Sequence, residues 1–110
     1  MPAKSAREVF EVHMPKRFGD NPGLSRQVNA VYKFVLTGDG GGTWSVDLTR
    51  EPAAVEEEDA EAQCTITVPT SVFIDIMNGK LTGQKAFLSG KLKVKGKIGL
   101  ALKLGAVLGK

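Results

Sequence analysis

The sequence predicts an α+β fold, and three patterns in its 110 residues point to that class. Alternating apolar and polar residues indicate strands at 28–36, 43–48 and 63–68. Apolar residues at helical spacing indicate helices at 4–13 and 71–78. A glycine run at 38–42 joins the first two strands and predicts a β-hairpin. The length suits one hydrophobic core, so a single domain over residues 1–110 is expected.

The first predicted helix has a start signal and a stop signal. Ser5 is placed to cap its first turn, and Glu8 follows three residues later. Pro15 is expected to stop or kink the helix, because proline lacks the amide hydrogen that a helix needs. The sequence around Pro22 (GDNPG, residues 19–23) is typical of a loop.

The second half alternates between short helices and strands. Residues 53–56 could form a short third strand in the middle of the chain. The helix at 71–78 ends at Asn78-Gly79, a common helix terminator. A short helix over 83–89 follows, and then a strand over 91–95 whose apolar face carries Leu92 and Val94.

The last segment is unusually apolar for a chain of this size. If residues 98–108 form one helix, their apolar side chains cover an arc of roughly 220°, where about 100° is enough to contact a core. One small sheet cannot cover that arc. Another helix, another chain, a membrane or a bound apolar molecule would have to cover the remainder, and these four alternatives stay open.

Charge is divided unevenly along the chain. Five acidic residues crowd positions 56–61, and eight lysines with no acid follow Asp75. A basic C-terminal region favours anionic partners such as phosphate head groups, and predicts transient contact with an anionic membrane surface. A solvated face is the plainer explanation for most of these lysines.

Several functional classes lack the residues that they need. The glycine run leads into a strand, whereas a phosphate-binding loop leads into a helix. His13 is the only histidine and Cys64 the only cysteine, so neither a catalytic pair nor a metal site is expected. We therefore expect no enzyme activity and no cofactor. The aromatic residues are not interleaved with basic ones, and no nucleic-acid partner is expected.

No stretch is long enough to span a membrane, since about 20 apolar residues are needed. The first ten residues, MPAKSAREVF, contain no apolar signal region, so we expect a cytoplasmic location.

The residues from about 29 to 108 resemble the sterol carrier protein 2 family. The likeness begins with Phe34, Gly38 and the hairpin sequence GGTWSVDL at 41–48. It continues through CTITV at 64–68, Phe73, GKL at 79–81, Ala86-Phe87, GKLKV at 90–94, Gly96 and GLALKL at 99–104. The run from Gly79 to Leu104 is its most specific part.

This resemblance implies a five-stranded, mainly antiparallel sheet with helices over one face and an apolar tunnel between them. It also implies non-enzymatic binding or transfer of a lipid, such as a fatty acid, a fatty acyl-CoA, a phospholipid or a sterol. Because Pro15 is expected to break the N-terminal helix, that helix should cover the tunnel incompletely.

The predicted lipid-binding residues are the apolar side chains of the elements that would surround the tunnel. They are Trp44, Phe73, Ile76, Met77, Phe87, Leu92, Val94, Ile98, Ala101, Leu102 and Leu104. Lys97 or Lys103 could meet a carboxylate or phosphate head group at the mouth of the tunnel.

An interaction or accessory module is the alternative hypothesis. In that case the terminal helix would bind a partner or a second copy through Leu100, Leu104 and Leu108. The sequence leaves the oligomeric state and the identity of the lipid open.

Overall fold

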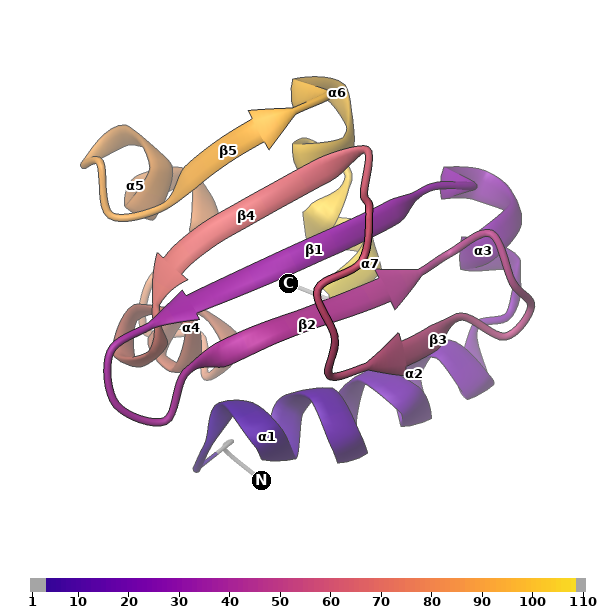
Figure 1. Ribbon diagram of the computed structural model, residues 1–110, viewed down its shortest axis with the longest axis horizontal. Helices are drawn as coiled ribbons and strands as arrows, with labels where there is room; N and C mark the ends of the chain where they lie inside the picture. Colours follow the sequence, from indigo (N-terminus) through magenta and orange to yellow (C-terminus); the bar gives the residue numbers. More distant parts are fainter. Residues whose placement is uncertain (1–3, 109–110) are drawn as a thin grey trace.

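Five strands form a single mixed sheet in the computed structural model, which describes residues 4–108. The strands lie in the order β3-β2-β1-β4-β5 (Figure 1). Their bounds are β1 Val31–Thr37, β2 Gly42–Asp47, β3 Ala54–Glu56, β4 Cys64–Pro69 and β5 Lys93–Gly96. Only the β1–β4 pair is parallel, and the other three pairs are antiparallel. The predicted fold class, including the short third strand, is confirmed.

One face of this sheet carries the core. Along β1, Tyr32, Phe34 and Leu36 are buried and their neighbours are partly exposed, as the alternating pattern predicts. Phe34 lies opposite Trp44 on β2 and opposite Ile66 on β4. Strand β1 therefore forms the central line of the core, with β2 and β4 on either side.

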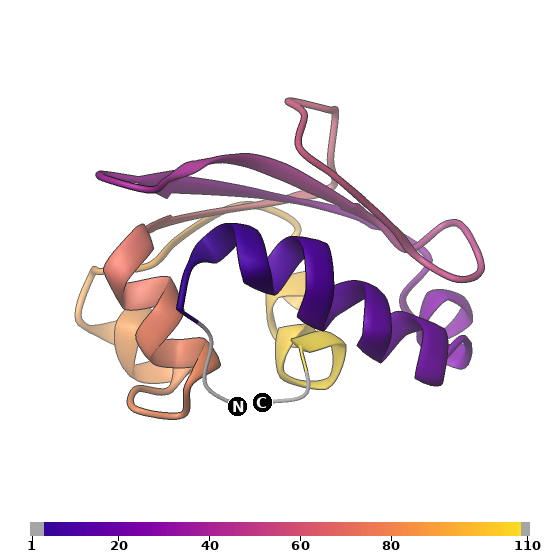
Figure 2. The same cartoon turned by 90° about the horizontal axis from the view of Figure 1, so that it is seen from below.

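All the helices lie against this buried face, and Figure 2 shows them in one layer beneath the sheet. The N-terminal helical region comprises α1 Ala6–Glu8, the π-helix η1 Val9–His13 and α2 Met14–Asp20. The remaining helices are α3 Gly23–Val28, α4 Thr70–Met77, α5 Gly83–Leu88, α6 Ile98–Ala101 and α7 Leu104–Leu108. The molecule thus has two layers, and the space between them is filled by apolar side chains from both.

The N-terminal helix is not broken at Pro15, contrary to the prediction. Ser5 caps it as expected, by accepting a hydrogen bond from the Glu8 amide. The chain then widens into a π-helix, in which the Met14 amide donates to the carbonyl of Val9 five residues earlier. A proline ring in a regular helix clashes with a carbonyl of the preceding turn, and the wider π turn relieves that clash. The helix therefore continues to Asp20 and covers the β2–β3 side of the sheet.

A further helix, α3, was missed by the sequence analysis. Residues 23–28 form this helix, so β1 begins at Val31 rather than at Val28. Asn29 ends α3 in the left-handed conformation with φ +47°, and its amide donates to the Ser25 carbonyl. Asparagine tolerates this conformation better than most residues, so Asn29 was the available signal for a helix end.

The C-terminal segment forms two short helices instead of the single predicted one. The helix α6 ends at Ala101, and α7 begins at Leu104 after a turn. Gly99 and Gly105 weaken a continuous helix here, since each glycine costs about 1 kcal/mol relative to alanine. The predicted arc of 220° on one helix is therefore wrong. The turn lets the apolar side chains before and after it point in different directions.

The outer face of the sheet is partly covered by the acidic loop between β3 and β4. Asp59 accepts an ion-paired hydrogen bond from Lys33 at 2.9 Å, and the Ser45 hydroxyl lies 3.3 Å from Glu58. Ser45 is buried although it faces away from the helices. The acidic loop thus lies against the sheet.

Candidate functional site

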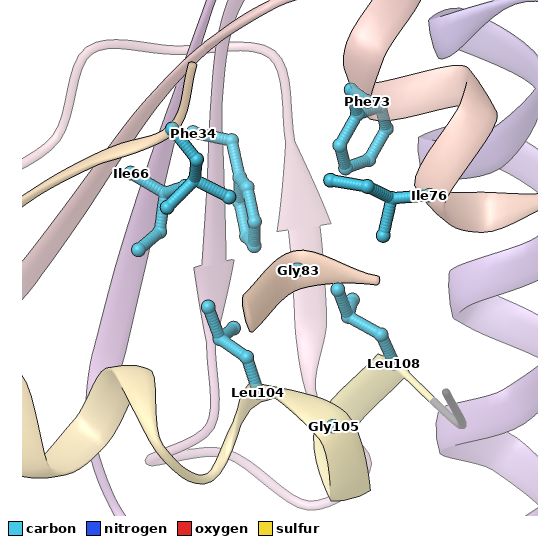
Figure 3. A pocket seen from close by; sticks show the side chains of 9 residues that line it. Phe34, Ile66, Phe73, Ile76, Gly83, Leu104, Gly105 and Leu108 are labelled. Atoms are coloured by element: carbon cyan, nitrogen blue, oxygen red, sulfur yellow. The ribbon is translucent and has the colours of Figure 1, made fainter. Parts of the chain in front are cut away.

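An apolar pocket lies between the sheet and the helices, and Figure 3 shows its walls. Its lining residues are Phe34, Ile66, Phe73, Ile76, Gly83, Leu92, Leu104, Gly105 and Leu108. No lining side chain is polar or charged. Such a pocket can hold an apolar group by exclusion of water, but it offers no side-chain group that could catalyse a reaction.

Two strands of the sheet and two helices supply most of the side chains that converge in Figure 3. Phe34 and Ile66 come from the sheet, Phe73 and Ile76 from α4, and Leu104 and Leu108 from α7. In α7, Leu104 and Leu108 are four residues apart and therefore lie on the same side of the helix. The C-terminal helix α7 is thus a wall of the pocket.

Polar contacts to main-chain carbonyls fix the C-terminal segment over the core. The Arg17 side chain donates Nε–H to the Val107 carbonyl at 2.9 Å, and its Nη2 donates to the Ala106 carbonyl. The Tyr32 hydroxyl donates to the Leu100 carbonyl at 2.5 Å. Val107 is fully buried between these contacts. The position of the pocket wall therefore depends on residues of α2 and β1, far away in the sequence.

The pocket encloses a volume of about 70 Å³. A cavity needs about 10–15 Å³ on this measure to hold one water molecule, so the void accommodates only a few atoms. Pockets that bury drug-sized ligands are roughly 300–1,000 Å³. A long aliphatic chain is larger than the volume of this pocket.

The structure brings four of the eleven predicted residues together in this pocket, namely Phe73, Ile76, Leu92 and Leu104. Met77, Val94 and Ala101 are half-buried and pack against the edge of the core without lining the pocket. Phe87, Ile98 and Leu102 are exposed, and Leu102 retains 83% of its accessible surface. Lipid contact remains a prediction for these six residues and for Trp44, whose surroundings are distinct.

Trp44 lies under the N-terminal helix and not at the pocket. Its ring stacks on Phe10 with the ring centroids 4.7 Å apart and an interplanar angle of 6°. The Arg7 guanidinium lies 5.3 Å from the centre of the Trp44 ring, and Arg7 also pairs with Glu57 at 2.9 Å. These contacts give Trp44 a structural role in joining the helix layer to the sheet.

Sequence reasoning missed five lining residues: Phe34, Ile66, Gly83, Gly105 and Leu108. Phe34 and Ile66 could have been found, because they lie on the same predicted sheet face as Trp44 and Val68. Gly105 and Leu108 depend on the direction of α7 after the turn at residues 102–103, which periodicity does not predict. Gly83 leaves room at the start of α5, where an added Cβ would meet no atom within 4 Å.

Other candidate chemistry is sparse in the part of the chain that the structure describes. No group of three metal-binding side chains occurs among residues 4–108. His13 lies 3.2 Å from Glu8, and this hydrogen bond lowers the pKa of the Glu8 carboxyl. Burial raises the pKa of the Cys64 thiol, so less of the reactive thiolate form is present at neutral pH. None of the described helices has the length and hydropathy of a membrane span.

Comparisons with known proteins give a consistent result. Residues 13–109 match the model of the SCP-2 sterol transfer family. The chain is 43% identical over 81 residues to mouse hydroxysteroid dehydrogenase-like protein 2, covering 72% of this chain but 16% of that protein. It is 34% identical over 114 residues to human sterol carrier protein 2, covering 94% of this chain and 21% of that protein. The chain thus spans about a fifth of the length of these relatives.

Solved structures agree with the sequence relatives. Sterol carrier protein 2 from Aedes aegypti, determined in complex with palmitate, is 31% identical and superposes with a TM-score of 0.77. That match covers 98% of this chain and 96% of the mosquito protein. The apo form of the Yarrowia lipolytica protein is 25% identical, with a TM-score of 0.72 over 93% of this chain and 82% of that chain. The resemblance seen in the sequence is confirmed: this chain belongs to the SCP-2 sterol transfer family.

Proposed function

We propose that this protein binds the aliphatic part of a lipid between its sheet and its helices, and carries that lipid without chemical change. The observation that supports this most directly is the apolar pocket, which is lined by side chains from β1, β4, α4 and α7. The palmitate complexes of two Aedes aegypti relatives, at 31% and 28% identity, add support from the same fold.

The proposed entry of a lipid involves α7. This helix has five residues, and isolated helices of that length are unstable in water. It is held by Val107 and by the two hydrogen bonds from Arg17. A displacement of α7 away from the sheet would enlarge the pocket at Leu104 and Leu108. The tunnel predicted from the sequence would then form on binding.

The remaining parts of this proposal concern the head group, the ligand class and the cellular setting. Lys97 and Lys103 are exposed on either side of α6, where they could pair with a carboxylate or phosphate at the mouth.

A single fatty-acid chain suits the narrow pocket better than a broad sterol ring system. We retain the cytoplasmic location as a proposal, together with the absence of enzyme activity, since all the lining residues are apolar or glycine.

A pair of tryptophan substitutions tests this function. Leu104→Trp puts a large ring where the pocket is, whereas Val12→Trp adds the same ring at an exposed position on the N-terminal helix, away from the pocket. We expect Leu104→Trp to weaken binding of a fluorescent fatty acid at least tenfold, and Val12→Trp to bind within about twofold of wild type.

Two results would contradict the proposal. The first is a folded wild-type protein that binds no fatty acid and yields no lipid in an organic extract after purification. The second is equal loss of binding in both variants, which would show that binding does not depend on the pocket. Circular dichroism of each variant checks that the fold is intact.

A further inference from the structure

The exposed apolar side chains of this molecule are concentrated in one segment. Among residues 4–108 the exposed large hydrophobic residues are Val12, Phe87, Leu88, Ile98 and Leu102. All but Val12 lie between positions 87 and 102, with Leu88 at 74% and Leu102 at 83% exposure. Single exposed apolar side chains are common on protein surfaces, whereas several within one segment indicate an interaction surface.

The same segment contains the excess of positive charge. Residues 76–110 hold eight of the fifteen basic residues and none of the twelve acidic ones. The chain as a whole has a net charge of +3, so residues 76–110 carry +8 and residues 1–75 carry −5. Lys91, Lys93, Lys95 and Lys97 are all exposed, and within residues 4–108 no ion pair involves them.

These residues form one edge of the molecule. Strand β5 is the outermost strand on its side of the sheet, and Figure 1 shows α5, β5 and α6 in a row along that edge. We call residues 85–103 the basic edge. Leu88 lies at one end of it and Ile98 and Leu102 at the other, with the lysines of β5 between them. Along this edge the apolar residues thus lie before and after the basic strand, whose Lys93 and Lys95 share the outer sheet face with Thr65 and Thr67.

The N-terminal helix lies on the opposite side of the molecule, next to β2 and β3 (Figure 1). Its exposed charges are mixed and largely paired, since Arg7 pairs with Glu11 and Lys16 with Asp20. Val12 is exposed on this helix, where basic and acidic side chains are present in similar numbers. This face provides a natural internal control, with a similar apolar side chain but no excess of charge.

We propose that the basic edge docks onto an anionic lipid bilayer, with Leu88, Ile98 and Leu102 inserted among the lipids and the lysines against the phosphates. This inference rests on the proposed function. Two pocket residues lie next to this edge, since Gly83 begins α5 and Leu92 directly precedes β5. Docking there would bring the pocket to the membrane from which a lipid is taken.

A bilayer fits this edge better than a second copy of the chain. In a symmetric dimer formed through the basic edge, the lysines of one copy would face those of the other with no acidic residue between them. Like charges placed opposite each other are strongly unfavourable at an interface. An anionic bilayer presents many phosphates at once, and each lysine near such a surface adds to the attraction.

The test is co-sedimentation of the full chain with vesicles of phosphatidylcholine alone, or of phosphatidylcholine and phosphatidylserine in equal amounts. We expect binding to the anionic vesicles that falls steeply with added salt, and little binding to the neutral ones. Neutralising two lysines of the edge, in Lys93→Gln with Lys95→Gln, should lower the partition coefficient about 30-fold. The matched pair Lys4→Gln with Lys16→Gln should lower it less than about threefold.

Apolar insertion is tested in the same assay. Leu88→Ser with Leu102→Ser should lower the partition coefficient by at least about tenfold, while Val12→Ser should leave it unchanged. Equal losses in the edge variants and their controls would overturn the proposal, as would the absence of binding to anionic vesicles. A stable dimer in light scattering that dissociates in the Leu88→Ser, Leu102→Ser variant would also overturn it, in favour of self-association.

Fatty-acid binding without vesicles separates this inference from the proposed function. Vesicle binding without fatty-acid binding would support docking and contradict the carrier role. Fatty-acid binding without vesicle binding would contradict docking alone.

Discussion

Tyr32 shows how a single residue links the sheet to the C-terminal segment. Its side chain is fully buried on β1, and its hydroxyl donates to the main-chain carbonyl of Leu100. Burial raises the pKa of Tyr32 to about 12 from an ordinary value of 10.0. The phenol therefore stays protonated well above pH 10 and keeps its hydrogen bond there. Ionisation would put a negative charge beside a carbonyl oxygen inside the core.

This raised pKa predicts a loss of stability in alkaline solution. The folded state holds the Tyr32 proton more tightly than the unfolded chain does. The resulting stabilisation is complete below pH 10, the ordinary pKa, and disappears as the pH rises towards 12. Two pKa units correspond to about 2–3 kcal/mol. We expect the difference in unfolding free energy between wild type and Tyr32→Phe, measured in urea, to shrink by that amount between pH 9 and pH 12.

The comparison with Tyr32→Phe removes the effect of lysine deprotonation, which is common to both proteins. Tyr32 is the only tyrosine, so absorbance of the phenolate reports its ionisation directly. Parallel stability curves for the two proteins over this pH range would contradict the interpretation.

At the scale of elements, the C-terminal segment is where sequence and structure differ most. The strands could be predicted because alternation of apolar residues reports directly which side of a strand is buried, as at Tyr32, Phe34 and Leu36. The last helix was predicted as one piece from the same kind of pattern. The turn at residues 102–103 makes that prediction wrong. Because of this turn, Leu102 is exposed to solvent and Leu104 lines the pocket.

Two other elements were mispredicted for local reasons. The π turn of η1 accommodates Pro15 through one extra residue in the helical turn, and no apolar pattern reports such a change. The helix α3 was hidden because Val28 fits the alternation of the strand that follows it. The wall that α4 contributes to the pocket could be predicted from the apolar stripe of this helix. The wall that α7 contributes depends on contacts with Arg17, which is distant in the sequence.

Those contacts make Arg17 the natural site for testing the role of α7. Arg17→Met keeps much of the aliphatic side chain but removes both hydrogen bonds to the carbonyls of Ala106 and Val107. We expect a loss of about 1–3 kcal/mol in unfolding free energy. We also expect faster amide hydrogen exchange at Val107, whose amide donates to the Lys103 carbonyl.

Arg26→Met is the matched control, because Arg26 makes an exposed ion pair with Glu51. Such a pair contributes about 0–1 kcal/mol and lies far from α7 in the sequence. If Val107 exchanged at the same rate in Arg17→Met as in wild type, α7 would not depend on Arg17, and the proposed opening would lose its basis.

At the scale of the whole molecule, the two sides of the fold differ in packing and in charge. On one side, the N-terminal helix packs on β2 and β3, and Phe10 stacks both on Trp44 of β2 and on Phe73 of α4. The other side, with β4, β5 and the last four helices, contributes most of the pocket lining and carries Lys91, Lys93, Lys95 and Lys97, which make no ion pair within residues 4–108. Phe73 both stacks on Phe10 and lines the pocket, so a lipid in the pocket would lie directly against the aromatic cluster.

The most direct test of this account is an isotope-filtered nuclear Overhauser experiment with ¹³C-labelled palmitate and unlabelled protein. We predict contacts from the chain methylenes to the methyl groups of Ile66, Ile76, Leu104 and Leu108, on the three sides of the pocket. Contacts confined to the exposed side chains of Leu88, Ile98 and Leu102, or no contacts at all, would contradict the claim that the lipid lies between sheet and helices.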